Sequence, residues 1–206
     1  MEKNKKRNRV SAAIPDKLRK KLYPVVFDLF SKSDFHQVNI REICKRTSIS
    51  PSTIYKYFQS KEDLIFRILD EKISELIKLI KEHVQGIESA KEILRKVFWV
   101  TMDFYDKNPG VAITVFITVP TRAWMKEKSY QRKEAQEIVK GVFENKNIKD
   151  QFDPSVDIEH VVGLYYMYCY RHIHLWYYHG MKWRLIDAIP RFFPICWRAV
   201  GRSDLL

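Results

Sequence analysis

The chain has 206 residues with 46% hydrophobic and 14% aromatic side chains, and it carries a formal net charge of +12. This composition excludes an intrinsically disordered chain and suffices for one or two domains with a buried core. No apolar run reaches the ~18–20 residues that cross a bilayer, and no apolar stretch follows the basic amino terminus as in a secretory signal. We therefore expect a cytoplasmic protein with no membrane partner.

The positive charge lies almost entirely in the first third of the chain. Residues 1–61 hold 15 Lys or Arg against 5 Asp or Glu, an excess of +10, whereas residues 62–206 add only +2. A basic head on a nearly neutral body is typical of proteins that bind a polyanion. A solvated basic surface without a partner would have the same charge, so charge alone leaves both interpretations open.

The cysteines and histidines form no recognisable disulfide or metal pattern. Three cysteines without a CxxC pair favour small buried side chains or free thiols over a redox sensor. His172 and His174 would point away from each other on a helix, and no third ligand accompanies His172 and His179 at helical spacing. We expect no metal and no other cofactor. The cysteines are Cys44, Cys169 and Cys196.

The first predicted elements are an arm and a helix. Residues 1–15 are predicted to be a flexible basic arm. A helix follows from about Asp16, the expected N-cap, because apolar residues recur at spacings of three and four as far as Phe30. Pro24 is expected either to start this helix or to kink it. The polar stretch 31–36 is predicted to be a turn.

Two short helices are predicted next. Asn39 is suited to cap the first, over residues 40–47, and a glutamate stands three residues later in capping-box position. A tight turn at 48–49 leads to the second, over residues 51–58. Ser50 is its expected cap, and the proline after it falls at the first helical position, where its missing N–H costs little.

The remainder of the chain is also predicted to be helical. Ser60 and Asp63 match the start of a long helix that ends near Gly86. The stretch 111–119 is rich in β-branched residues and would suit a strand, but no partner strand is evident, so a short helix is predicted. This makes an all-α chain of about nine helices. The further helices are expected over 88–107, 109–118, 120–146, 155–179 and 184–200.

Residues 16–58 have the layout of a helix-turn-helix: a supporting helix, then two short helices joined by a tight turn. The second short helix must enter the major groove of DNA, so its outer face needs small or hydrogen-bonding side chains. Ser52, Thr53, Tyr55 and Lys56 supply that face. The inner face holds Ile49, Ile54 and Phe58, which are expected to pack on Ile43 and Phe30.

Several short elements occur in order between Val25 and Leu69. They are Leu29-Phe30, Asn39, Tyr55-Lys56-Tyr57-Phe58 and Ser60-Lys61-Glu62-Asp63-Leu64. In this order they resemble the DNA-binding head of the TetR family of transcriptional regulators. The departures from the usual family pattern are Pro24, Ser33-Asp34-Phe35 in place of a glycine-containing turn, Cys44 in place of alanine, and Thr47-Ser48 in place of alanine-glycine.

The resemblance implies a role for each matched position. Asn39 and Arg41 would contact phosphates at the start of the first short helix. Lys61 would contact the backbone from the start of the long helix, and the basic arm could reach the minor groove or flanking phosphates. Ser50, Ser52, Thr53 and Lys56 would face base edges or nearby phosphates, and Tyr55 and Tyr57 would hydrogen-bond phosphates.

The resemblance also implies the organisation of the chain. Residues 16–62 would form the DNA-binding domain, and residues 63–206 a larger helical ligand-binding and dimerisation domain. Its last two helices would form a four-helix dimer interface, while helices four to eight would enclose a ligand cavity. Residues 165–179 suit this arrangement, since a helix that is aromatic on every side needs partners on every side.

A homodimer is expected for an independent reason, because a two-fold dimer reads two half-sites of a palindrome. The expected effector is a hydrophobic or aromatic small molecule held by large side chains with polar tips. Fatty acyl derivatives, planar cations and phenolic compounds stay open, although sparse acidic residues disfavour a cation. The candidate lining residues are Phe98, Met102, Tyr105, Phe116, Trp124, Tyr165, Tyr168, His172 and Trp176.

The sequence thus predicts a ligand-responsive DNA-binding transcriptional regulator: a repressor that binds double-stranded DNA at a palindromic operator as a dimer and is released by its effector. The repressor sign follows only from the family resemblance. No Gly-rich phosphate loop, GxSxG or HExxH motif occurs, so we expect no enzymatic activity. The alternative is a non-specific or architectural DNA-binding protein without an effector, which would share the uneven charge.

Overall fold

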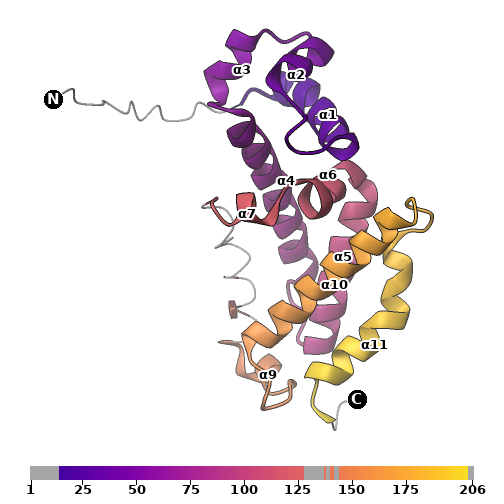
Figure 1. Ribbon diagram of the computed structural model, residues 1–206. Helices are drawn as coiled ribbons and strands as arrows, with labels where there is room; N and C mark the ends of the chain where they lie inside the picture. Colours follow the sequence, from indigo (N-terminus) through magenta and orange to yellow (C-terminus); the bar gives the residue numbers. More distant parts are fainter. Residues whose placement is uncertain (1–13, 128–136, 138–139, 142–143, 204–206) are drawn as a thin grey trace, which may run out of the picture. The chain divides into compact units, whose positions relative to one another are not determined.

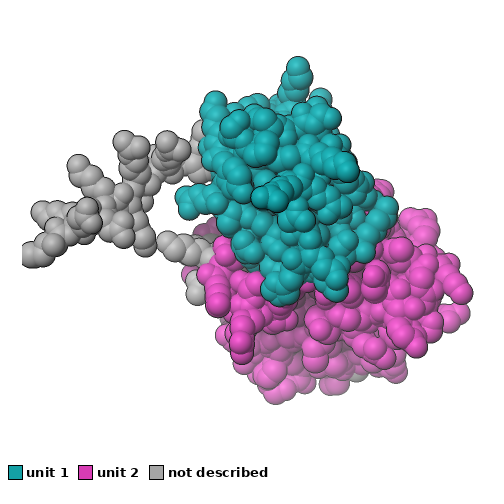
Figure 2. Space-filling view, turned by 45° about the horizontal axis from the view of Figure 1, so that its top comes forward, with its two compact units in different colours: residues 1–68 teal, residues 69–206 magenta. Residues whose placement is uncertain are grey.

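The computed structural model describes residues 14–127, 137, 140–141 and 144–203. These residues form ten α-helices with one π-helix and one 3-10 helix, and they contain no β-strand, which confirms the all-α prediction. None of the described helices is both long and apolar enough to cross a membrane. The chain divides into two compact units, residues 1–68 and 69–206, coloured teal and magenta in Figure 2.

The first unit is built from three helices and the start of a fourth (Figure 1). They are α1 (Asp16–Lys32), α2 (Ile40–Thr47), α3 (Pro51–Tyr57) and the first two turns of α4 (Lys61–Val84). The side chains predicted to fill the helix-turn-helix core are buried, apart from the partly exposed Ile49. The fully buried members are Phe30, Ile43, Ile54 and Phe58.

Side-chain caps start the helices of this unit where the sequence places them. Asn39 Oδ1 accepts from the Glu42 N–H at 3.0 Å, and Ser50 Oγ accepts from the Thr53 N–H at 3.2 Å. Ser60 Oγ accepts from the backbone N–H three residues on, at 3.1 Å. Each cap pairs a backbone donor that the helix itself cannot pair. The predicted starts of α2, α3 and α4 are therefore confirmed.

The first helix differs from its prediction. Pro15 is the N-cap and Asp16 is the first helical residue, so the expected Asp16 cap is wrong. The helix neither starts nor breaks at Pro24 but continues through it to Lys32, which shortens the predicted turn. Pro24 is exposed, so water can reach the carbonyl that loses its partner there, while the buried face of α1 holds the helix together.

Ser48, in the turn between α2 and α3, has a left-handed backbone with φ of 51°. A side chain in this region costs about 1 kcal/mol, whereas glycine adopts it freely. We expect Ser48→Gly to raise the free energy of unfolding by about 1 kcal/mol, measured by urea titration. An unchanged or lower value would mean that the serine side chain stabilises this turn.

The second unit contains the rest of α4 and the remaining helices. In Figure 1, α10 and α11 run side by side in opposite directions, and α11 also packs on α5, while α6 and the π-helix pack on α10. The elements are α5 (Ala90–Lys107), α6 (Pro109–Ile113), η1 (Thr114–Thr118), α7 (Thr121–Trp124), α9 (Lys146–Lys149), α10 (Ile158–Tyr178), η3 (Leu185–Ala188) and α11 (Ile189–Val200).

Two predictions in this unit have different outcomes. Residues 109–118 are helical, as α6 and η1, which confirms the predicted short helix. The single helix predicted over 120–146 is wrong, because α7 ends at Trp124 and the next three residues form a turn. Met125 and Lys126 are exposed, so the chain has no buried face at this point to hold the helix together. Most of residues 128–146, and residues 1–13 of the predicted arm, lie outside the described residues, whereas Ile14 at the end of that arm is buried.

Candidate nucleic-acid interface and ligand site

The outer face of α3 is polar and open to solvent. Tyr55 is 54% exposed, Ser52 and Lys56 are exposed, and Thr53 and Tyr57 are half-buried. The Lys56 ammonium lies 5.5 Å from the centre of the Tyr57 ring. This face offers hydroxyl and ammonium donors that can reach base edges or phosphates.

The hydroxyl groups at the start of α3 form a cluster. Ser50 Oγ lies 2.9 Å from Ser52 Oγ and 2.8 Å from Thr53 Oγ1, besides capping the helix. These contacts orient the three hydroxyls, each of which can still donate or accept. On α2, Asn39 is engaged as a cap through its oxygen, and Arg41 is exposed.

Lys61 does more than face solvent. Its ammonium donates to the Phe35 carbonyl at 2.7 Å and lies 4.9 Å from the centre of the Phe35 ring. It therefore ties the start of α4 to the turn between α1 and α2. Because an ammonium has three donors, this bond leaves capacity for a phosphate.

Two further side chains of α4 bind the end of α3. Arg67 Nη1 donates to the carbonyl of Tyr57, the last residue of α3, and its guanidinium lies 5.1 Å from the Phe58 ring centre. Asp63 Oδ2 accepts from the Gln59 N–H at 2.7 Å. The sequence reasoning missed Arg67, although it follows Asp63 by four residues and so shares its helix face.

An ion-pair cluster links α1 to α2. Asp28 accepts from Arg46 at 2.6 Å and pairs with Lys32 at 2.5 Å. The hydrogen bonds from Lys32 and then Arg46 hold the pKa of Asp28 below its usual value. Because the cluster is largely solvent-exposed, its ion pairs add little to the free energy of unfolding. Their main effect is to hold α1 and α2 in position.

In the second unit, four predicted ligand residues form one aromatic cluster. The Phe98 ring centre lies 5.7 Å from that of Tyr165 and 4.9 Å from that of Tyr168. Tyr168 in turn stacks on His172 at 5.1 Å. The Tyr165 hydroxyl is 3.0 Å from Thr101 Oγ1. Residues from α5 and α10, distant in sequence, thus meet in one cluster, and their role as a ligand lining stays a prediction.

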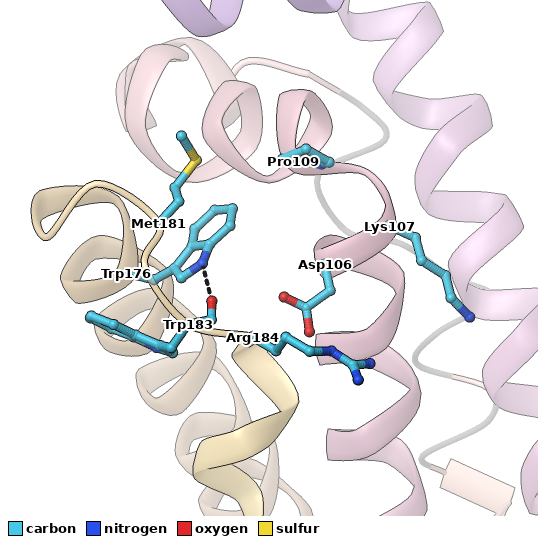
Figure 3. A pocket seen from close by; sticks show the side chains of 7 residues that line it. All are labelled: Asp106, Lys107, Pro109, Trp176, Met181, Trp183 and Arg184. Atoms are coloured by element: carbon cyan, nitrogen blue, oxygen red, sulfur yellow. Dashed lines mark hydrogen bonds between the residues drawn. The ribbon is translucent and has the colours of Figure 1, made fainter.

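The other candidates are distributed around this cluster. Tyr105 contacts Phe116, with ring centres 5.4 Å apart, and Met102 and Trp124 are buried. Trp176 lines a separate surface pocket of about 380 Å³ and donates from Nε1 to the Trp183 carbonyl at 2.9 Å (Figure 3). The predicted set is therefore not one continuous lining of a single described pocket.

Phe192 and Phe193 of α11 belong to the aromatic cluster, although the sequence reasoning did not select them. Phe192 stacks on Tyr168 at 4.3 Å, and Phe193 lies 6.2 Å from Phe98. Their place in the apolar pattern of 184–200 was visible, but a pattern alone does not tell which helix they would contact.

The first unit matches the family model described as bacterial regulatory proteins, tetR family, over residues 27–68. Over these residues the chain is similar to the DNA-binding head of the TetR family. The matched segment contains α2, α3 and the start of α4, so the polar face of α3 lies on a TetR-type helix-turn-helix.

The curated relatives match only part of the chain. The fatty acid metabolism regulator protein of Bacillus subtilis is 25% identical over 115 residues, which is 55% of this chain and 56% of that relative. The match thus spans about half the length of this curated relative. It is shorter for the regulator UidR of Escherichia coli, with 28% identity over 39% of this chain and 41% of that protein.

Solved structures show the same fold over nearly the whole chain. FadR from Bacillus subtilis, solved in complex with stearoyl-CoA, superposes with a TM-score of 0.67 and 18% identity, covering 86% of this chain and 96% of that one. At such identity the likeness concerns the fold. The second unit therefore shares its helical fold with the corresponding part of that structure.

Lys56 is the α3 side chain best placed to donate to guanine acceptors or a phosphate. If it contacts DNA in this TetR-type head, we expect Lys56→Ala to weaken DNA binding about 5- to 100-fold and, for a phosphate contact, to reduce the salt slope by about 1. Fluorescence anisotropy at several salt concentrations measures both. Lys126→Ala, which removes an exposed charge from the second unit, is the control. Equal effects of the two variants would contradict the assignment.

His172 should make the stability of this protein depend on pH. Burial lowers its pKa below the ordinary value of 6.5, against a hydrogen bond to the Leu185 backbone and the charge of Asp106, which raise it. Below pH 6.5 the unfolded chain therefore takes up a proton that the folded chain does not, so stability falls as the pH decreases towards the folded pKa. His172→Gln should flatten this dependence in urea titrations at pH 7.5 and 5.5. An equal loss of stability between pH 7.5 and 5.5 in the unchanged protein and in His172→Gln would contradict this role of His172.

Proposed function

We propose that this protein is a ligand-responsive transcriptional repressor that binds a palindromic operator as a homodimer and is released by a hydrophobic small molecule. The observation that carries the proposal is the exposed polar face of α3 on a TetR-type helix-turn-helix. In this proposal residues 16–62 recognise DNA, residues 63–206 bind ligand and dimerise, and the chain has no enzymatic role.

The predicted DNA contacts are part of the proposal. Ser52, Thr53, Tyr55 and Lys56 would meet the major groove, because they occupy the outer face of α3. The amino terminus of α2, with Asn39 and Arg41, would meet a phosphate, since its free N–H groups attract anions. Ser50, Tyr57 and Lys61 would orient these groups and contact the backbone. The excess positive charge of the first third of the chain supports this side of the proposal.

A long-chain acyl thioester is the effector class that we propose. The aromatic cluster of α5, α10 and α11 supplies apolar surface, as an acyl chain requires. Two matches point the same way: a Bacillus subtilis relative is named a fatty acid metabolism regulator, and FadR from the same species was solved with stearoyl-CoA. That ligand belongs to FadR, and its class comes to this chain only as a proposal.

A partner surface for dimerisation is offered by α10. Its exposed large side chains recur at helical spacing and form a stripe separate from the buried face of Tyr168 and Trp176. Exposed apolar patches of this kind mark interaction surfaces in soluble proteins. The stripe consists of Tyr166, Met167, Tyr170, Tyr177 and Tyr178, and α11 adds the exposed Ile195.

The regulatory step would be a shift between two conformers. The effector would bind the DNA-releasing conformer more tightly, since only differential affinity can shift such an equilibrium. Swinging of α4 is the movement we propose, because this helix continues from the first unit into the second.

Fluorescence anisotropy with the full chain tests this proposal. The duplexes are the region upstream of its own gene and a scrambled sequence, both at physiological salt. We expect a preference of about 10³-fold or more for one site in the upstream duplex, and release on addition of stearoyl-CoA. Equal affinity for both duplexes would favour an architectural DNA-binding protein. Retained binding in stearoyl-CoA would overturn the effector class.

A further inference from the structure

One face of α10 carries three aromatic side chains at intervals of four residues: Tyr168, His172 and Trp176. Trp176 Nε1 is paired with the Trp183 carbonyl. Within the described part of the chain, the buried Tyr168 Oη and His172 Nε2 have no hydrogen-bond partner. Buried polar atoms in folded proteins are nearly always paired, with protein, water or ligand. Tyr168 Oη and His172 Nε2 therefore indicate a binding site for a molecule that can form hydrogen bonds with them.

The surroundings of the pair are aromatic and apolar. The Tyr168 ring lies between His172, at 5.1 Å and 10°, and Phe192, at 4.3 Å and 29°, with Phe98 against it edge-on at 4.9 Å. Tyr168 is only 5% exposed. Burial raises the pKa of Tyr168 and lowers the pKa of His172, so both side chains are held in their neutral forms near neutral pH.

A surface pocket, drawn in Figure 3, lies one helical turn beyond His172, at Trp176. Trp176, one turn beyond His172, lines that pocket, and so does Asp106, whose charge acts on His172. The Asp106 carboxylate accepts from the backbone N–H groups of Leu185 and Ile186, at 2.7 and 3.2 Å. The pocket is about 380 Å³, a size in the range of small-molecule sites.

These groups distinguish a neutral guest from an anionic one. A carboxylate here would lose its hydration among aromatic rings, and this burial opposes its binding. The pocket beyond Trp176 holds Lys107 and Arg184 as well as Asp106, so the selectivity rests on burial beside Tyr168 and not on the charge of the pocket. A carbonyl or hydroxyl oxygen can accept from the Tyr168 hydroxyl without bringing a charge. The Leu185 backbone already hydrogen-bonds the imidazole, and the unpaired His172 Nε2 can pair with a hydroxyl, which both donates and accepts.

We propose that Tyr168 and His172 bind a neutral oxygen-bearing group of the effector, an ester, thioester or hydroxyl, and that the site disfavours the corresponding carboxylate. The inference rests on the proposed function, in which a hydrophobic compound occupies the second unit. It adds the polar group that the compound must carry and the two side chains that recognise it.

Direct binding without DNA tests this selectivity. The probes are methyl dodecanoate, 1-dodecanol and dodecanoate, which share a chain length, and binding is followed by calorimetry or tryptophan fluorescence at pH 7.5. We expect both neutral probes to bind at least ten-fold more tightly than dodecanoate. Equal or tighter binding of dodecanoate, or no binding of any probe, would overturn the proposal. Operator binding is measured separately, so such a failure leaves the DNA-binding proposal standing.

Two matched variants assign the effect to the proposed side chain. Tyr168→Phe keeps the aromatic stack and removes the unpaired hydroxyl. It should weaken binding of the neutral probes about 5- to 20-fold while leaving the Tm of the free protein equal or higher. Thr114→Val removes a buried hydroxyl that is paired with the Gly110 carbonyl, and it should lower the Tm and leave the preference for neutral probes intact. An unchanged probe affinity in Tyr168→Phe, or a Tm drop matching that of Thr114→Val, would indicate an internally bound water only.

Discussion

Replacing Phe58 by alanine is expected to unfold the DNA-binding head. This side chain is 1% exposed, and its backbone N–H ends α3 by donating to the Ile54 carbonyl at 2.9 Å. Its ring also supports the guanidinium of Arg67, which holds the Tyr57 carbonyl. Losing a buried phenylalanine costs about 3–5 kcal/mol, a large fraction of the total stability of a small domain.

The measurement combines hydrogen exchange with DNA binding. Amides of residues 16–68 should lose protection in Phe58→Ala, while the helical signal of the second unit persists and DNA binding is lost. Tyr55→Ala is the matched control, since it removes a neighbouring aromatic ring of α3 that is exposed. It should leave protection intact even if DNA affinity falls. Equal protection in both variants would mean that Phe58 does not hold the head together.

Tyr170→Asp is expected to separate the proposed dimer. Tyr170 lies in the exposed stripe of α10, 54% exposed, with its ring centre 4.0 Å from that of His174. In a two-fold interface each substitution occurs twice, so two carboxylates would be buried near the same axis. Burying unpaired charge costs several kcal/mol, which corresponds to a loss of dimer affinity of more than about 100-fold.

Sedimentation equilibrium and operator titrations measure this effect. The variant should sediment as a monomer and bind a full palindrome at least about 100-fold more weakly, while its affinity for a half-site stays unchanged. Met125→Asp places the same charge on an exposed side chain at the end of α7 and should leave the dimer intact. A dimeric Tyr170→Asp protein would place the interface elsewhere.

If both results hold, the two units contribute in different ways. The first unit presents α3 through a small core, in which Phe58 and the backbone contacts of Lys61, Asp63 and Arg67 position the helix. The second unit would set the distance between two such heads. Both Phe58→Ala and Tyr170→Asp would abolish tight DNA binding, but only Phe58→Ala would change the structure of the head.

Local chemistry made much of the head predictable. Asn39, Ser50 and Ser60 cap the helices that the sequence assigns to them, because a cap depends on residues only three positions away. The all-α class followed in the same way from short-range periodicity, and so did the polar outer face of α3. The continuation of α1 through Pro24 and the end of α7 at Trp124 were not predicted. Packing of a buried face decides whether a helix continues, and short-range patterns do not show that packing.

Only the tertiary structure decided which distant residues meet. Lys61 is a basic residue at a helix start by sequence, but the fold turns it towards the Phe35 carbonyl 26 residues away. The aromatic candidates of α5 and α10 meet Phe192 of α11, whereas Trp176 lines another pocket. Sequence alone determined the basic head, its recognition helix and the aromatic richness of the body, all of which are properties of single segments. Which rings stack, and which polar atoms stay unpaired among them, depends on how those segments pack, because such contacts join residues that no local pattern connects.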